Sequence, residues 1–353
     1  MTPASTSSAT RESSPLVRAA ITSVTLLLLT LSPPALADEA PEPDILVPVP
    51  AAVFSDPELQ KMWAIDAIAP FEDKAPLWSM RDPEFQQLVE AEIEKLGLDD
   101  EVRRKQLSLA VVDLTDDEHP RFAAINGDLM IYAASLPKIA VLLAAFELIA
   151  QHKMDYDSET EALLKNMIRR SSNSATTEMM HRVGKETIAR VLLSPRYRLY
   201  DPAHNGGLWV GKDYAKSGTW KRDPLHSISH GATVIQVARF YYLLHTGNLV
   251  TPKHSEMMLE VLADSAINHK FKAALAVAAP EAELFRKSGS WRNYHSDSAL
   301  VKHKGRTYIL VALSNGEEGK KWLGDIAVSM DALVLRTAKP PGLVSRGLRW
   351  LKE

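Results

Sequence analysis

Apolar and polar residues follow two different periods along this chain. Apolar residues at helical spacing predict helices over 58–66, 82–97, 135–152, 158–170, 172–183, 185–193, 231–246, 254–262 and 321–337. Alternating runs predict strands over 107–113, 121–125, 298–302 and 306–314. The last two runs flank Lys304 and Gly305, as in an antiparallel hairpin. Strands near both ends of the domain and helices between them predict an α/β sandwich, in which helices flank one antiparallel sheet and a helical subdomain is inserted in the middle.

The first 37 residues have the pattern of a secretory signal peptide. Arg11 and Arg18 precede a short apolar segment over 19–31, two prolines interrupt it, and residues 35–37 read Ala-Leu-Ala, a small-residue cleavage site. The segment is too short and too interrupted for a typical membrane span. We therefore expect cleavage after Ala37 and a periplasmic or secreted protein, with an uncleaved anchor as the alternative.

The rest of the chain divides into three parts. Residues 38–57 are rich in proline and acidic side chains, which predicts an extended linker. Residues 58–337 carry the periodic patterns and are expected to form the folded domain. Residues 338–353 are basic and partly apolar; a short packed helix or a frayed end is favoured over a membrane-surface helix because the segment is short.

Composition excludes several function classes. The chain has 353 residues, a hydrophobic content of 46%, a net charge of −3 and no cysteine. Without cysteine it has no thiol nucleophile, disulfide or Cys-based metal site. The charge gives no sign of a nucleic-acid or firm membrane partner. His226 and His230 are four residues apart but lack the glutamate of a zinc helix, so neither a metal nor a cofactor is expected. We expect a monomer.

Candidate chemistry begins at the segment Ser-Leu-Pro-Lys over 135–138. Pro137 suits a first helical turn, and the apolar run that follows predicts a buried helix. Residues three apart share one face of a helix, so Lys138 can bring its amine beside the Ser135 hydroxyl. A serine with a neutral amine in reach, at a helix N-terminus, can attack a carbonyl group.

Two further segments add polar groups of the same kind. Ser171 and Asn173 lie at a predicted turn and can point into one cleft. The segment Lys-Ser-Gly over 287–289 precedes the terminal hairpin, and its glycine would let a substrate backbone approach closely. A near copy, Lys-Ser-Gly-Thr-Trp over 216–220, lies in a polar stretch before a helix, so we prefer the copy at 287–291 as the edge-strand motif.

Together these segments resemble the three motifs of the penicillin-recognising serine hydrolases, Ser-x-x-Lys, Ser-Asp-Asn and Lys-Thr-Gly. The resemblance is to the class A β-lactamase-like group and covers roughly residues 82–337. It implies the β-lactamase/transpeptidase fold. The chain departs from the pattern at Ser172, which stands in place of aspartate, and at Ser288, which replaces threonine and keeps the hydroxyl.

The resemblance also implies a role for each matched residue. Ser135 would be the acyl-forming nucleophile, Lys138 its base or proton relay, and Ser171 a proton shuttle to the leaving nitrogen. For the substrate it implies that Asn173 holds an amide side chain, that Lys287 with Ser288 binds a carboxylate, that Gly289 allows close approach, and that the backbone N–H groups of Ser135 and Ser290 form the oxyanion hole.

The pattern leaves open which residue acts as the base that releases the acyl group. Class A enzymes carry a glutamate in a Glu-Pro-x-x-Asn loop, and the nearest match here begins with Asp201 and Pro202. An aspartate is one methylene shorter, and a displacement on the order of 1 Å can cost about 100-fold in rate. Asp201 is either that base or part of an ordinary turn. As a turn residue it would leave acylation intact and hydrolysis of the acyl-enzyme slow.

The expected function is an exported serine hydrolase that acts on an amide bond through an acyl-Ser135 intermediate. Hydrolysis of β-lactams in the manner of class A enzymes is the first hypothesis. A D-alanyl-D-alanine peptidase acting on peptidoglycan is the second, because a weak deacylation base suits a lysine-driven mechanism. A non-catalytic cell-wall binding module that retains the cleft is the third.

Overall fold

The computed structural model describes residues 77–214 and 221–337. The predicted signal peptide, linker, helix over 58–66 and C-terminal tail, and the second Lys-Ser-Gly copy at 216–220, lie outside the described residues.

The helices of the described ranges are η2 (Leu77–Met80), α2 (Pro83–Lys95), α3 (Asp99–Arg103), α4 (Lys138–Ala150), α5 (Ser158–Arg169), α6 (Asn173–Val183), α7 (Lys185–Leu193), η3 (Pro202–His204), α8 (Val234–His245), α9 (Pro252–Leu262), α10 (Phe271–Ala278) and α11 (Gly319–Thr337). The strands are β1 (Leu107–Asp113), β2 (Arg121–Ile125), β3 (Ile131–Tyr132), β4 (Tyr200–Asp201), β5 (Gly206–Gly207), β6 (Trp209–Val210), β7 (His230–Ala232), β8 (Glu283–Trp291), β9 (Tyr294–His303) and β10 (Arg306–Asn315).

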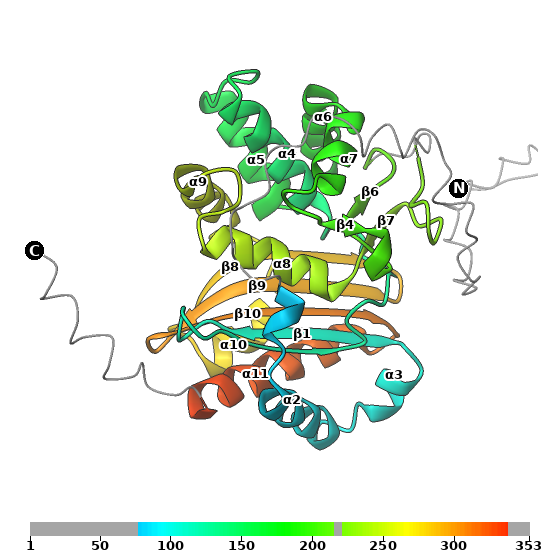
Figure 1. The fold of residues 1–353 in the computed structure, drawn as a ribbon, viewed down its shortest axis with the longest axis vertical. Helices are drawn as coiled ribbons and strands as arrows, with labels where there is room; N and C mark the ends of the chain where they lie inside the picture. Colours follow the sequence, from blue (N-terminus) through cyan, green and yellow to red (C-terminus); the bar gives the residue numbers. More distant parts are fainter. Residues whose placement is uncertain (1–76, 215–220, 338–353) are drawn as a thin grey trace, which may run out of the picture. The chain divides into compact units, whose positions relative to one another are not determined.

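One antiparallel sheet organises the fold, with the strand order β2-β1-β10-β9-β8. Helices α2, α10 and α11 cover one face, and α8 covers the other (Figure 1). Helices α4 to α7 and α9 gather beyond α8, near the edge strand β8 (Figure 1). The predicted sandwich with an inserted helical subdomain is confirmed, and β8 is the sheet edge beside that subdomain.

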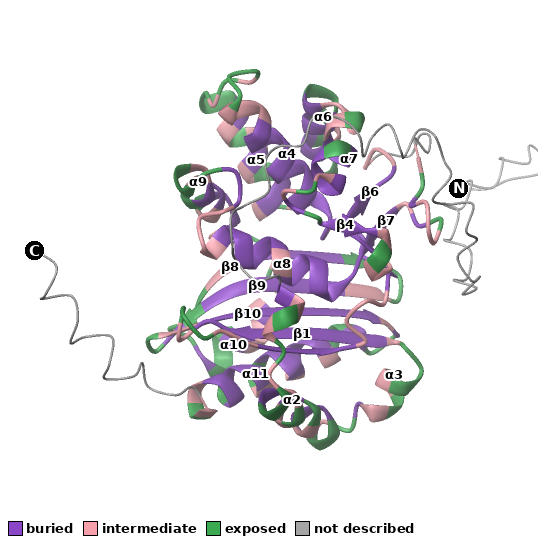
Figure 2. Cartoon of the chain, viewed as in Figure 1, coloured by how far each residue is buried: buried purple, intermediate pink, exposed green. Residues whose placement is uncertain are grey.

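Both faces of the sheet are buried, which the alternation along β1 makes plain. Ala110 and Val112 pack into the core under α8, whereas Leu109 and Val111 pack into the core against α2 and α11. An antiparallel sheet often leaves one face to water, but here helices cover both (Figure 2). The strands that carry functional groups are therefore held rigidly from two sides.

Helix α4 is buried around nearly its whole circumference. Its residues from Lys138 to Glu147 are all buried, because apolar side chains occupy every face rather than one stripe. The helix begins at Lys138, and Ser135 lies in the turn before it, so the predicted start at residue 135 was wrong by one turn. Ala134, just before this turn, has a φ of 50°, a conformation that non-glycine residues adopt rarely.

The strand β7 replaces the first part of the helix predicted over 231–246. Residues 230–232 pair with β3 and β6, and α8 begins at Val234 after the Thr233 side chain caps it. The hydroxyl of Thr233 accepts the N–H of Gln236 at 3.4 Å. The apolar pattern continues through the strand into the helix, so periodicity alone could not separate them.

Helix α10, the short strands β3 to β7 and the strand β8 were not among the predicted elements, although the 287–291 motif was expected on an edge strand. No helix within the described ranges is long and apolar enough to cross a membrane.

Candidate active site

Lys138 is buried at the start of α4, and its amine contacts the turn between α5 and α6. Its Nζ donates to the carbonyl oxygen of Ser171 at 2.7 Å and to Asn173 Oδ1 at 2.8 Å. Ser171 Oγ is 3.4 Å from the same nitrogen. Three of the residues expected at the site are therefore joined by one amine.

Burial lowers the pKa of Lys138 to about 7 from its ordinary value of 10.5. Desolvation disfavours the ammonium form, and no carboxylate of the described residues forms an ion pair with Lys138 to offset it. A neutral amine has two N–H groups and one lone pair. Because Ser171 O and Asn173 Oδ1 use the two N–H groups, the lone pair is left to take a proton from a neighbouring hydroxyl.

Ser171 lies in the α5–α6 turn with a φ of 56°. Its Oγ accepts from Lys287 Nζ at 3.0 Å, so the hydroxyl lies between two lysine amines. A positive φ at a serine costs energy, and such positions cluster at functional sites. The next residue, Ser172, caps α6 by accepting the N–H of Ala175 at 3.2 Å, a role that aspartate and serine fill equally well.

Lys287 reaches Ser171 from the edge strand β8. Its Nζ also donates to the carbonyl oxygen of Ser288 at 2.6 Å, and the side chain is buried. Burial, together with the nearby positive charge of Lys138, lowers the pKa of Lys287 well below its ordinary value. The strand and the helical subdomain therefore meet at a pair of lysines whose ammonium forms are both disfavoured.

Gly289 allows β8 to lie directly against the nucleophile turn. A Cβ at this position would lie 2.2 Å from the carbonyl oxygen of Ala133 and 2.7 Å from the backbone nitrogen of Ser135. Through the space left free, Ser296 Oγ on β9 donates to the Ala133 carbonyl at 2.8 Å. Ser290, the next residue on the strand, is exposed. The backbone of β8 and the N–H of Ser135 are thus neighbours, as an oxyanion hole formed by Ser135 and Ser290 requires.

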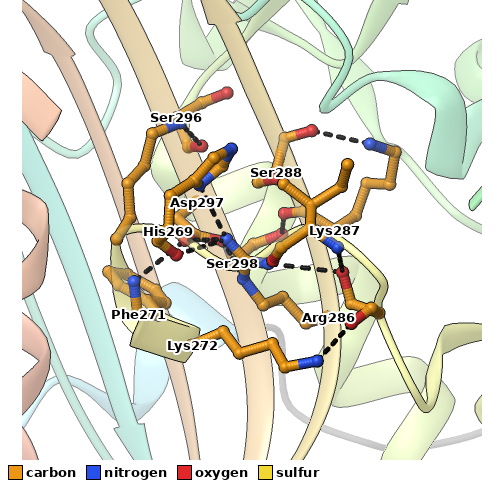
Figure 3. A network of polar contacts seen from close by, with 12 residues as sticks. His269, Phe271, Lys272, Arg286, Lys287, Ser288, Ser296, Asp297 and Ser298 are labelled. Atoms are coloured by element: carbon orange, nitrogen blue, oxygen red, sulfur yellow. Dashed lines mark hydrogen bonds and ion pairs between the residues drawn. The ribbon is translucent and has the colours of Figure 1, made fainter. Parts of the chain in front are cut away.

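A buried ion pair anchors β8 and β9 behind the site (Figure 3). Arg286 Nε lies 2.8 Å from Asp297 Oδ1, and Arg286 Nη2 lies 2.7 Å from Oδ2, with both side chains fully buried. The same guanidinium donates to the carbonyl oxygens of Ile267 and His269 at 2.8 and 3.0 Å. The pair therefore fixes the loop before α10 to the strand that carries Lys287.

Lys270 in that loop adds a second anchor. Its buried amine donates to the carbonyl oxygen of Gly289, and to that of Ser296 at 2.9 Å. Burial lowers the pKa of Lys270 to about 8. These contacts hold the stretch of β8 that lies beside Ser135.

Asp201 is not joined to the other candidate residues by any contact of its carboxylate. It accepts from Arg198 at 2.6 and 3.1 Å, from the backbone N–H of Ala203 at 3.0 Å, and lies 3.1 Å from His204 Nδ1. Burial alone would raise the pKa of Asp201, but the hydrogen bonds from Arg198 and His204 bring it below the ordinary value. The carboxylate thus caps η3 and pairs with Arg198.

The match to known families follows the same part of the chain. The model of the β-lactamase enzyme family matches residues 88–162 and 159–330, which contain all the candidate catalytic and substrate-binding residues. The chain belongs to this family. No curated protein matches it.

Solved structures of similar fold are class A β-lactamases and a penicillin-binding protein. This β-lactamase-family chain is similar to PBP-A, with a TM-score of 0.55 and 14% identity over 72% of this chain and 97% of the other. It is similar to a β-lactamase from Sphaerobacter thermophilus, with a TM-score of 0.54 and 16% identity over 72% and 99% of the two chains. It is also similar to a class A representative from Bacteroides cellulosilyticus, with a TM-score of 0.53 and 17% identity over 70% and 96%. Identities this low establish the fold, and the family match establishes a serine hydrolase of the β-lactamase and penicillin-binding type.

Two aromatic residues of this β-lactamase-family site were not predicted to belong to it, and one of them, His230, was considered only as a metal ligand. The ring of Tyr214 lies over Lys138, with 4.7 Å between Nζ and the ring centroid, and it stacks on His230 with centroids 4.2 Å apart. Burial lowers the pKa of His230 to about 3, so this ring is neutral near neutral pH. Among the described residues no group of three or more His, Cys, Asp or Glu is arranged to hold a metal. No motif in the sequence singles out Tyr214, because its neighbours at the site are distant in the chain.

Proposed function

We propose that this chain is an exported hydrolase that opens β-lactam amides through an acyl-Ser135 intermediate. The observation that carries the proposal is the buried amine of Lys138, which has both N–H groups occupied by Ser171 and Asn173 and a pKa lowered to about 7. An amine in this state can accept the Ser135 proton near neutral pH as the hydroxyl attacks.

The steps of acylation balance on these groups. Ser135 Oγ forms a bond to the carbonyl carbon and loses its proton to Lys138. The oxyanion is held by the backbone N–H groups of Ser135 and Ser290. When the C–N bond breaks, the leaving nitrogen takes a proton through Ser171, whose hydroxyl lies between Lys138 and Lys287.

Substrate binding in this proposal uses the groups around the same hydroxyl. Asn173 is exposed at the start of α6 and faces the substrate's amide side chain, while the amine of Lys287 and the hydroxyl of Ser288 provide hydrogen-bond donors for its carboxylate. One similar structure, a mutant of PBP-A, is an acyl-enzyme complex with penicillin G, with a TM-score of 0.56 and 14% identity to this chain. That ligand makes penicillins the first substrates to test.

Release of the acyl group is proposed to be slow. The Asp201 carboxylate is engaged by Arg198, His204 and the N–H of Ala203, so this proposal assigns the base for both steps to Lys138. A site whose base is a lysine suits cleavage of a D-alanyl-D-alanine peptide as well as hydrolysis of a β-lactam. This observation supports the second candidate, a D-alanyl-D-alanine peptidase of peptidoglycan.

The decisive experiment uses the mature protein and its Ser135→Ala variant with penicillin G and a chromogenic cephalosporin. Turnover and intact mass are followed together. Rapid turnover that disappears in the variant supports a β-lactamase. A persistent mass adduct without turnover supports a peptidase, which release of D-alanine from a synthetic D-alanyl-D-alanine peptide would establish. Absence of both adduct and turnover would contradict the proposal and favour a binding module.

Export is proposed on the pattern of residues 1–37 alone. Expression of the full chain with its own leader should place the protein in the periplasm or the medium, and N-terminal sequencing should begin at Asp38. Retention of Met1 in a membrane fraction would indicate an uncleaved anchor instead.

A further inference from the structure

Tyr214 contacts both the proposed base and the turn that carries the proposed nucleophile. Its ring covers Lys138 at 4.7 Å, and its hydroxyl donates to the carbonyl oxygen of Ala134 at 3.1 Å. Ala134 is the residue before the nucleophile and holds a φ of 50°. One side chain therefore touches the proposed base and ties down the turn that presents Ser135.

The ring completes the enclosure of the Lys138 amine. Ser171 and Asn173 accept hydrogen bonds from the amine. The ring of Tyr214 covers a further side of it with an aromatic face, against which water has no good hydrogen-bonding partner. Behind it, the stacked imidazole of His230 is parallel to within 4° and is buried, which keeps the tyrosine ring flat in place. Tyr214 cannot swing away without losing this stack and the bond to Ala134.

We propose that Tyr214 is a positioning residue for acylation: its ring keeps water from the Lys138 amine, and its hydroxyl holds the nucleophile turn in place. This inference rests on the proposed function. It adds a residue outside the three motifs, and it gives the ring and the hydroxyl of that residue different roles.

Two opposing effects of the ring decide the sign. The face of a tyrosine ring attracts a cation, which by itself would favour the ammonium form. Water hydrates an ammonium group far more strongly, and full burial can shift the pKa of a lysine by about 3–5 units. Removal of the ring admits water, so the pKa of Lys138 should rise.

The test also depends on which other titratable groups of the described residues interact with Lys138. Lys287 on β8 and His230 on β7 both interact with it electrostatically. His230 stays neutral over the range tested because burial lowers its pKa to about 3, and burial also raises the pKa of Tyr214 well above its ordinary value. The lysines are thus the groups that titrate, and Lys287 must be distinguished from Lys138.

The test compares Tyr214→Ala, which removes the ring, with Tyr214→Phe, which removes only the hydroxyl. The rate of adduct formation with penicillin G is measured by intact mass between pH 5 and 10. In Tyr214→Ala the midpoint of the pH profile should rise by about one unit, with acylation about tenfold slower below it. Tyr214→Phe should keep the wild-type midpoint and lose only maximal rate. An unmoved midpoint in Tyr214→Ala would overturn the proposal; Tyr214→Ser serves if the alanine variant does not fold.

A second readout does not depend on activity. Protein labelled with ¹³C at the lysine ε-carbon gives a titration curve for Lys138, assigned by the loss of its signal in Lys138→Arg, and this separates it from Lys287. An upward shift in Tyr214→Ala supports the inference even if no β-lactam reacts, whereas an unchanged titration refutes it even if acylation is fast. Failure of the proposed function and failure of the role of Tyr214 therefore give different results.

Discussion

Lys287 Nζ donates to Ser171 Oγ at 3.0 Å, although the two residues are 116 positions apart in the chain. One lies on the edge strand and the other in a turn of the helical subdomain. The hydroxyl is also 3.4 Å from Lys138 at the start of α4. A single oxygen atom thus marks where three separate elements meet, and the site exists only when the subdomain docks against β8.

The pH dependence of acylation should follow deprotonation of Lys138. Because burial lowers the pKa of this amine to about 7, the rate of adduct formation should rise with pH through neutrality and level off above it. Lys138→Arg, which stays charged at all these values, should be slower by at least about 100-fold. The exposed Lys321→Arg on α11 is the matched control and should react like wild type; a pH-independent rate would remove Lys138 as the base.

Replacement of Lys138 by methionine should stabilise the protein while it abolishes acylation. In the unfolded chain the amine keeps its proton up to about pH 10.5, whereas the folded protein disfavours that proton above about pH 7. The cost of burying the amine is therefore complete below pH 7 and declines as pH rises toward 10.5. Loss of the bonds to Ser171 and Asn173 offsets part of the gain.

Urea unfolding should accordingly show Lys138→Met about 2 kcal/mol more stable than wild type at pH 6, with the difference shrinking at pH 10. A variant that is less stable at pH 6 would show that the hydrogen bonds outweigh the burial penalty.

Gly289→Ala should disrupt the nucleophile turn. The added Cβ would lie 2.2 Å from the Ala133 carbonyl oxygen and 2.6 Å from Ser296 Oγ, distances that no ordinary contact allows. We expect a loss of about 2–3 kcal/mol in the free energy of unfolding and loss of adduct formation. Gly324→Ala on α11 is the control, because its Cβ would lie 3.5 Å from Ala274 Cβ and the change favours the helix. Equal thermal midpoints for the two variants would contradict the prediction.

The buried pair of Arg286 and Asp297 should be costly to break from either side. Both side chains are fully buried, so Asp297→Asn or Arg286→Met leaves the charge of the other side chain without its ion-pair partner. The expected cost is about 3–5 kcal/mol in the free energy of unfolding. Chemical denaturation measures this directly. The double variant should lose less than the sum of the two single losses, because it leaves no isolated charge; simple additivity would argue against a coupled pair.

Asp201→Asn should leave the lifetime of the acyl-enzyme within about twofold of wild type, because the carboxylate is committed to Arg198 and to the cap of η3. The half-life of the penicillin adduct by intact mass is the measurement. Because the pKa of Asp201 is lowered in the folded protein, its carboxylate stabilises the fold at pH values above its pKa in the unfolded chain. This stabilisation is lost as pH falls. An adduct that lasts about tenfold longer or more in the variant would identify Asp201 as the deacylation base.

Local pattern was enough for the elements whose period is unambiguous. The strands β1 and β2 were predicted to the residue, and α5 to α7 came within a residue or so, because their apolar spacing and their polar ends agree. The prediction was wrong at β7, where a helical pattern runs into a strand that pairs with β3 and β6. Pairing of this kind depends on distant segments, which periodicity does not contain.

The amino-acid sequence was enough to predict the candidate groups, Ser135 with Lys138, Ser171 with Asn173, and Lys287, together with the helix that follows Ser135 and the hairpin that follows Lys287. The protonation and the hydrogen bonding of these groups depend on the folded structure. The pKa of Lys138 and the enclosure of its amine by Tyr214 arise from burial and from contacts between segments far apart in the chain. Proton affinity depends on how much water reaches an atom and on which charges face it, and only the packed fold sets those two quantities.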